Sequence, residues 1–138
     1  MGDIAKTIRT HLINSATITG IVDVGNIFVS NSPKAKATKQ IVIKEIPGPS
    51  NSVLDLEQGN LNLIVVVDGD KVSEPYAETK TIVEAILDLL NKKNETLLDT
   101  DSAMRWLVKS GVDYIYNQDE YYWMAVITFG YVEGGITE

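Results

Sequence analysis

The chain has 138 residues, 44% of them hydrophobic and 22% charged, which is the composition of a globular protein rather than a disordered or fibrous one. Its net charge of -7 argues against a protein that neutralises nucleic-acid phosphates over its whole surface. The absence of cysteine excludes disulfides, thiolate metal sites and cysteine nucleophiles. The length fits a single domain over residues 1–138. The sequence has no signal peptide and no apolar run of the ~20 residues that span a bilayer, so we expect a soluble intracellular protein.

The N-terminal segment, about residues 3–13, has the apolar periodicity of an amphipathic helix. Its expected buried face consists of Ile4, Ala5, Ile8 and Leu12. Residues 18–24 form a second short apolar segment, which predicts a short helix or a turn, and residues 27–29 are rich in strand formers. The chain is therefore expected to open with two helical segments followed by one strand.

The middle of the chain predicts two strands separated by a turn. Residues 30–39 contain a proline, three lysines and no large apolar side chain, which predicts an exposed loop, and residues 40–46 then alternate as a strand. Proline and glycine within residues 47–52 predict a chain reversal or a mobile loop. Residues 53–67 return to a strand pattern whose last part is apolar on both faces, which implies burial on both sides, and residues 68–70 end it.

Residues 74–91 predict the longest helix of the chain. Ser73 is a plausible N-cap, and Pro75 is tolerated in the first turn of a helix. Helical spacing then produces one stripe, made of Tyr76, Thr79, Ile82, Val83, Ile86, Leu87 and Leu90. Burying its aliphatic members contributes roughly 10 kcal/mol before ordering entropy is subtracted, so we expect this helix to pack on a sheet.

The C-terminal part alternates as strands. Residues 103–109 predict a strand that ends at Gly111, and residues 114–116 and 121–132 predict a hairpin with a polar tip at residues 117–120. Because strands and helices are segregated rather than regularly alternating, the pattern favours an α+β fold over a doubly wound one. We expect a mostly antiparallel or mixed β-sheet packed by the long helix and the N-terminal helix.

The sequence contains no recognisable catalytic or metal-binding pattern. His11 is the only histidine, which excludes a two-histidine zinc site and favours a structural or surface role for this residue. Asp68 and Asp70 fit a strand-ending turn better than a calcium loop, whose further ligands are missing. The remaining paired carboxylates are interpreted as solvated; they are Asp99 with Asp101 and Asp119 with Glu120. We therefore expect neither an enzyme nor a cofactor.

The last strand carries apolar and aromatic side chains on both of its faces. If one long helix covers one face of the sheet, Tyr122, Met124 and Val126 remain on the other face, where another subunit would cover them. The alternative is that the N-terminal helix covers this face. The sequence leaves both arrangements open.

The loop before the second strand is basic in an otherwise acidic protein, with Lys34, Lys36 and Lys39 as its cations. Solvation alone explains such a loop. The alternative is contact with DNA phosphates or with an acidic neighbour.

This order of elements, rather than any single motif, resembles the tail terminator and head-to-tail joining proteins of long-tailed bacteriophages. The resemblance covers nearly the whole chain, through the opening helix at 4–9, the segments 18–22, 27–29 and 40–43, the central strand 61–68, the long helix 77–90 and the closing strand 123–129. It implies a sheet flanked by helices, in agreement with the fold class expected from the residue patterns.

The resemblance also implies a function without catalysis. Such proteins form a ring, commonly hexameric, at the head-proximal end of the tail tube of the virion, after assembly in the host cytoplasm. The ring terminates the tail, contacts the tail tube protein and the head connector or stopper protein, and lets DNA pass through its lumen without sequence specificity; no membrane is involved. The alternatives are another neck or tail component, such as a connector stopper or tube subunit, or a small cellular ligand-binding or regulatory domain.

Overall fold

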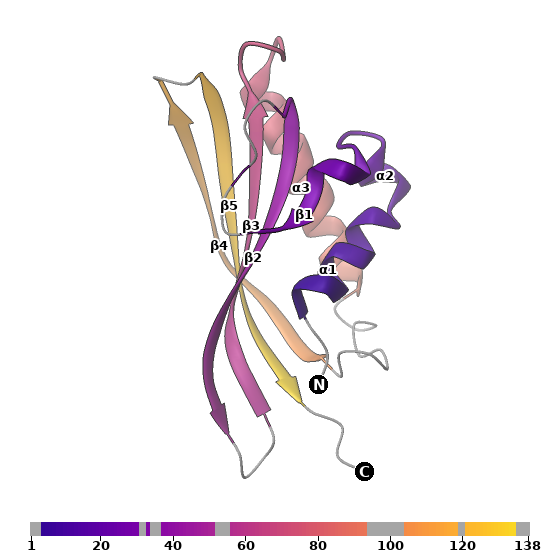
Figure 1. The fold of residues 1–138 in the computed structure, drawn as a ribbon, viewed down its shortest axis with the longest axis vertical. Coiled ribbons are helices and arrows are strands. Elements are labelled where there is room, and N and C mark those ends of the chain that lie inside the picture. The colour runs from indigo at the N-terminus through magenta and orange to yellow at the C-terminus, as the bar shows by residue number, and fades with distance from the viewer. Residues whose placement is uncertain are drawn as a thin grey trace.

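The computed structural model describes residues 4–30, 33, 37–51, 56–93, 104–118 and 121–134. Its elements are α1 (Ile4–Ile13), α2 (Ala16–Thr19), the 3-10 helix η1 (Val24–Asn26), β1 (Ile27–Val29), β2 (Lys39–Asn51), β3 (Leu56–Asp68), α3 (Pro75–Lys93), β4 (Met104–Asn117) and β5 (Tyr122–Gly134). The fold is α+β, as the sequence predicts, with a mixed five-stranded sheet and a layer of helices (Figure 1). Within the described residues, no helix combines the length and the apolar character needed to cross a membrane.

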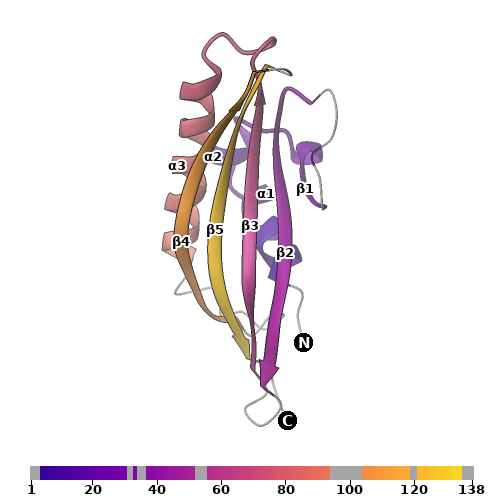
Figure 2. The same cartoon turned by 90° about the vertical axis from the view of Figure 1, so that its left-hand side faces the viewer.

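The sheet has the strand order β1-β2-β3-β5-β4. β1 runs parallel to β2, and the other neighbouring strands are antiparallel. The two inner long strands, β3 and β5, pair along their whole length, from Leu56 opposite Gly134 to Asp68 opposite Tyr122. The long strands twist together and extend beyond the helices at one end of the molecule (Figures 1 and 2).

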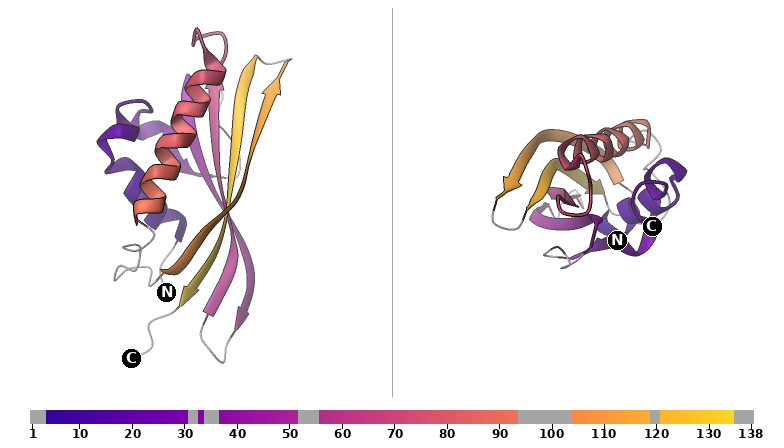
Figure 3. Two further views of the ribbon diagram at one scale, coloured as in Figure 1. Left: turned by 180° about the vertical axis from the view of Figure 1, so that it is seen from behind. Right: turned by 90° about the horizontal axis from the view of Figure 1, so that it is seen from above.

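The helices α1, α2 and α3 all pack on the same face of the sheet, which we call the inner face (Figures 1 and 3). α1 contacts β1 and β2, whereas α3 contacts β3 and β5. Between the helices and the inner face lies one continuous core, whose largest fully buried side chains include Phe129, Ile8, Leu12, Ile41, Leu63 and Ile86. We call the opposite side of the sheet the outer face.

The predicted apolar stripe of α1 is confirmed, since its expected face is buried throughout. The stripe of α3 is confirmed at its buried residues, which are Thr79, Ile82, Val83, Ile86 and Leu90. Leu87 is half-buried, and the prediction is wrong at Tyr76, which is 44% exposed. The Thr79 hydroxyl donates to the Pro75 carbonyl over 2.7 Å, so this buried polar group is satisfied. The short helix α2 begins earlier than predicted because the Ser15 side chain caps it, accepting a hydrogen bond from the Ile18 N–H over 3.4 Å.

The turn predicted at residues 47–52 is wrong over its described part. β2 continues through Pro47 as far as Asn51, and its pairing register with β3 shifts between Pro47 and Ser50. β1 pairs with β2 only from Ile41 to Ile43, so β2 is an edge strand at Pro47. Proline is tolerated there because edge strands and bulges can accommodate a residue without an N–H. Residues 52–55 lie outside the described residues.

The strand end predicted at Gly111 is also wrong. β4 runs without interruption from Met104 to Asn117, and a bulge between Lys109 and Gly111 shifts its register against β5. At the bulge, the Ser110 hydroxyl donates to the Thr128 carbonyl over 3.1 Å. The predicted hairpin is confirmed, with Asn117 opposite Tyr122, although residues 119–120 of its tip lie outside the described part of the chain.

Gly59 lies at a point in β3 where the structure leaves no room for a side chain. A Cβ atom there would lie 2.6 Å from the Ile46 carbonyl oxygen and 2.7 Å from the Tyr131 hydroxyl. Tyr131 cannot yield easily, because it is buried and its hydroxyl donates to the Glu45 carboxylate over 3.3 Å. Glycine is therefore required by close approach at this position.

We expect Gly59→Ala to lower the free energy of unfolding by about 1–3 kcal/mol, the usual cost of overpacking. Urea denaturation followed by circular dichroism measures the change. Gly111→Ala is the matched control, because a Cβ at Gly111 meets nothing within 4 Å, and we expect a change within about 0.5 kcal/mol. Equal losses in the two variants would contradict the steric explanation.

Candidate interaction surface on the outer face of the sheet

No described helix lies on the outer face, which Figure 2 shows from the front. The suggestion from the sequence that the N-terminal helix covers this face is wrong. The buried residues of α1 join the same core as those of α3, so both helices cover the inner face and neither is left for the outer one. The outer face is therefore the surface of the sheet that the described helices leave open.

The register places apolar side chains next to one another on the outer face. Val42, Ile64 and Val126 form one row across β2, β3 and β5. Val66, Met124 and Ile115 form the next row across β3, β5 and β4. With Tyr122 at the start of β5, these side chains make what we call the outer apolar band. Val42 and Val66 are buried, Ile115 is 45% exposed, and the others are half-buried.

The outer apolar band is bounded by polar residues toward the end of the sheet that extends past the helices. The row after Val42, Ile64 and Val126 consists of Lys44, Asn62 and Thr128. An apolar centre beside a polar margin is the usual composition of a surface between protein subunits. Its geometry suits burial against another protein better than catalysis.

The three residues that the sequence nominates for a subunit interface are brought together here. Tyr122, Met124 and Val126 project from successive outward positions of β5, and each is half-buried. Their neighbours Ile64, Val66 and Ile115 could not be nominated from the sequence, because only the register of β3, β5 and β4 places them alongside. Alternation within each strand was the one available signal.

A second cluster, which we call the aromatic corner, lies where the start of α3 meets the β4–β5 hairpin. The ring of Tyr76 lies 5.6 Å from that of Tyr114 and 4.7 Å from that of Trp123, and Tyr116 lies 5.1 Å from Trp123. Burial is the main cause that raises the pKa of Tyr114, followed by the charges of Tyr76 and Glu84. The sequence missed this cluster, because its members come from three elements that only the tertiary structure brings together.

The basic loop is described only in part. Lys34 and Lys36 lie outside the described residues, so their contact with DNA or with an acidic neighbour stays a prediction. Lys39 opens β2, and its ammonium group lies 3.1 Å from the Glu78 carboxylate of α3. This ion pair links the sheet to the helix layer, and each of its side chains is about one quarter to one third exposed, so its stabilising effect is small.

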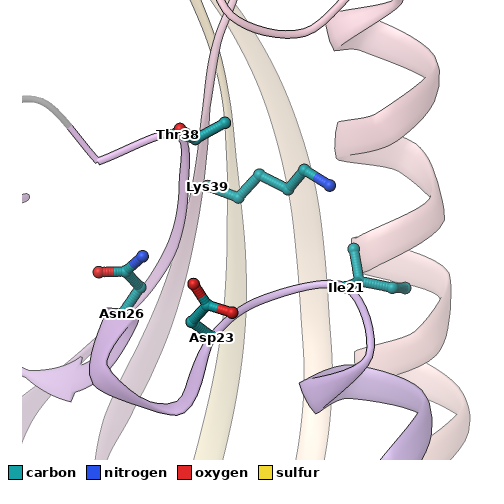
Figure 4. A pocket seen from close by; sticks show the side chains of 5 residues that line it. All are labelled: Ile21, Asp23, Asn26, Thr38 and Lys39. Carbon is teal, nitrogen blue, oxygen red and sulfur yellow. The ribbon is translucent and has the colours of Figure 1, made fainter.

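A pocket of about 250 Å³ lies beside Lys39 (Figure 4). It is lined by Ile21, Asp23, Asn26, Thr38 and Lys39. The pocket is open to solvent and does not form an enclosed site. The ammonium group of Lys39 is already paired with the Glu78 carboxylate, so the pocket holds no activated group. We assign it no chemistry.

The other candidate chemical groups are not assembled into a site. Asp68 is the last residue of β3, and its carboxylate accepts from the Asp70 N–H of the following turn over 2.9 Å. His11 lies half-buried in the last turn of α1, and the structure describes no group of three or more potential metal ligands among the residues that it covers. The other acidic pairs, Asp99 with Asp101 and Asp119 with Glu120, lie outside the described ranges.

The fold has a solved counterpart. A chain from the virion of a native gene transfer agent particle matches this chain with a TM-score of 0.76 at 13% sequence identity. The match covers 96% of this chain and 95% of that chain, so the two share the fold from end to end. No protein-family model matches the sequence, and no curated protein matches it.

Proposed function

We propose that this chain is a non-enzymatic structural protein of a virion. The observation that carries the proposal is the end-to-end match in fold to a chain of the gene transfer agent virion.

More specifically, we propose that the chain forms a ring at the head-proximal end of the tail tube. The ring, commonly of six subunits in the proteins that this sequence resembles, terminates the tail and joins it to the head connector. Its partners are further copies of itself, the tail tube protein and the connector or stopper protein, and DNA passes through its lumen. The alternatives, another neck or tail component or a small cellular binding domain, are separated from it by the experiments below.

The outer apolar band supports the assembly part of the proposal. Ile64, Met124 and Val126 are partly exposed apolar side chains in adjacent positions of a sheet face that no described helix covers. Leaving such a patch in water costs about 25 cal/mol for each Å² of apolar surface, a cost that a subunit contact removes. We assign this band to the contact between neighbouring subunits.

The location is tested by electron microscopy of particles labelled with an antibody against this chain. Label at the junction of head and tail agrees with the ring proposal, whereas label along the tube or at the distal tip indicates a different tail component. A chain absent from purified particles would overturn the virion assignment altogether.

The interface is tested by Met124→Glu, which introduces a charge into the centre of the outer apolar band. We expect the variant to remain folded, because Met124 is half-buried on the face away from the core, and to lose the oligomer. Size-exclusion chromatography with light scattering measures the mass, and thermal unfolding verifies the fold.

Val24→Glu is the matched control, because Val24 is an apolar side chain that is 46% exposed and lies on η1, away from the band. We expect this variant to keep the oligomer of the unmodified protein. If the unmodified protein is monomeric alone, the same comparison is made on the incorporation of each variant into particles. Equal behaviour of the two variants would reject the band as the subunit contact.

A further inference from the structure

The exposed apolar side chains of the described residues are unevenly distributed. Seven large apolar or aromatic side chains there are at least 40% exposed, and four of them lie at the end of the sheet that carries the β4–β5 hairpin. These four are Tyr76, Ile115, Tyr116 and Tyr121. The aromatic corner therefore continues outward into an exposed patch, which has the features of a contact site.

Tyr121, in this patch, has an unusual backbone conformation. Its φ angle is 55°, in the left-handed region that a bulky side chain rarely adopts. The Tyr121 carbonyl accepts from the Gly69 N–H over 2.6 Å, so the turn after β3 holds the residue in place. Its side chain is 53% exposed, so burial within this chain does not compensate the strain. Strained residues of this kind cluster where a side chain serves a contact.

The surroundings of the aromatic corner are acidic. Residues 68–84, which include the turn after β3 and the first half of α3, carry five carboxylates and two lysines. Glu78 points toward β2, where it pairs with Lys39. Glu84 acts on the other side of α3, because its charge adds to burial, the main cause, in raising the pKa of Tyr114. Aromatic rings beside carboxylates attract lysine and arginine side chains.

One stretch of the same chain supplies such cations. Residues 24–44 hold four lysines and no carboxylate, and Lys34 and Lys36 of this stretch belong to the basic loop. The described ends of the loop are bonded to the sheet. The Ser30 N–H donates to a carbonyl of β2 over 3.1 Å, and the Thr38 carbonyl accepts from the last N–H of β3 over 2.9 Å. The basic loop therefore begins and ends on the β1–β2 side of the sheet.

The register places the end of the basic loop and the aromatic corner at the same level of the sheet. One row runs across β2, β3, β5 and β4, and its members are Lys39, Val67, Trp123 and Tyr116. Three strand spacings, about 14 Å, separate its two ends. The first turn of α3 lies between them, with Glu78 toward Lys39 and Tyr76 toward Trp123. The basic loop would have to cross α3 to reach the corner of its own copy.

We propose that the basic loop of one copy, through Lys34 and Lys36, docks on the aromatic corner of the neighbouring copy. The inference rests on the proposed function. A ring is built from a heterologous contact, in which two different surfaces of the chain meet. The basic loop and the aromatic corner meet this requirement, because they lie on opposite sides of the sheet at the same level. Their opposite charges favour the contact of one with the other.

Photo-cross-linking from position 116 tests the proposal. A benzophenone amino acid takes the place of Tyr116, and the purified oligomer and whole particles are irradiated and their products mapped by mass spectrometry. We expect a cross-link to residues 33–39 in a product with twice the mass of the chain. The same amino acid at the position of Ile46, which is 40% exposed near the other end of β2, is the matched control. It should give at least tenfold less of this product.

Charge reversal tests the same contact by mutation. Lys34→Glu combined with Lys36→Glu should reduce the oligomer at least tenfold or, if the protein is monomeric alone, its incorporation into particles. Adding Glu84→Lys should restore assembly to within about threefold, because the corner then carries the opposite charge. Asp88→Lys is the matched control for this restoration, since Asp88 is exposed one turn further along α3, and it should not restore assembly. Thermal unfolding verifies that each variant is folded.

Each other outcome overturns the proposal. A cross-link within one chain would make the loop of the same copy the occupant, and a cross-link to another protein would make an unlike chain the occupant. No cross-link to residues 33–39, or normal assembly of the double lysine variant, would also reject it. Loss of assembly that Glu84→Lys does not restore would assign the loop to DNA phosphates instead. Failure of the proposed function is distinguishable, because it appears as absence of the chain from purified particles.

Discussion

Phe129→Ala is expected to lower the free energy of unfolding by about 3–5 kcal/mol, the largest loss that we predict for a single substitution. Phe129 lies on the inner face of β5, opposite Leu61 of β3, and is 2% exposed. Its removal leaves a cavity that the sheet and helices cannot fill, because long paired strands on either side fix the backbone. A domain of this size has about 5–15 kcal/mol of stability in total, so the variant should be close to unfolding.

The measurement is urea denaturation at 25 °C, with Thr128→Ala as the matched control. Thr128 is the adjacent residue of the same strand, but it lies half-buried on the outer face. The bond from the Ser110 hydroxyl to the backbone carbonyl of residue 128 is retained in this variant. A loss no greater in Phe129→Ala than in Thr128→Ala would mean that the inner face has been assigned to the wrong side of β5.

Ile86→Ala in the middle of α3 is expected to cost about 2–5 kcal/mol. Ile86 is fully buried against the sheet, in the same stripe as Ile82 and Leu90. Alanine is a better helix former than isoleucine, so the loss reports packing rather than helix propensity. We expect a matching fall of the melting temperature in differential scanning calorimetry.

Two further variants at α3 make this result decisive. Ile86→Val removes one methylene group from the same site and should cost about 0.5–1.5 kcal/mol. Asp88→Ala lies on the exposed side of the helix and should change stability by less than about 0.5 kcal/mol. An unchanged melting temperature in Ile86→Ala would show that the apolar stripe of α3 is not buried against the sheet.

Strong periodicity predicted the helices and the faces of the strands correctly. The stripes of α1 and α3 and the two faces of β5 follow from spacing alone, since 3.6 and 2 residues per repeat are properties of the backbone. Local signals failed at Pro47 and Gly111. Both residues usually end strands, but here β2 and β4 continue past them through register shifts, because pairing with β3 and β5 on one side outweighs the local preference.

The candidate surface was predictable only in part. The alternation of side chains in β5 predicted Tyr122, Met124 and Val126 as surface candidates. It did not indicate whether a helix covers them. The sequence contained no sign that the residues of the aromatic corner lie together. Its pattern predicts only that Tyr76 belongs to a helix stripe and that Trp123 belongs to a strand. The hydrogen bond from the Arg9 side chain to the Ile27 carbonyl also had no sequence signal, because it joins residues distant in the chain.

The sequence by itself determined the fold class, the periodic faces and the lack of a recognisable catalytic pattern, because these depend on residue type and local spacing. Only the tertiary structure decided which side of the sheet the helices cover. A helix can bury its stripe on either side of a sheet, and that choice depends on the summed packing of the whole core rather than on any one segment. By placing α1 and α3 together on the inner face, this packing leaves Met124 and Val126 on the face that no described helix covers.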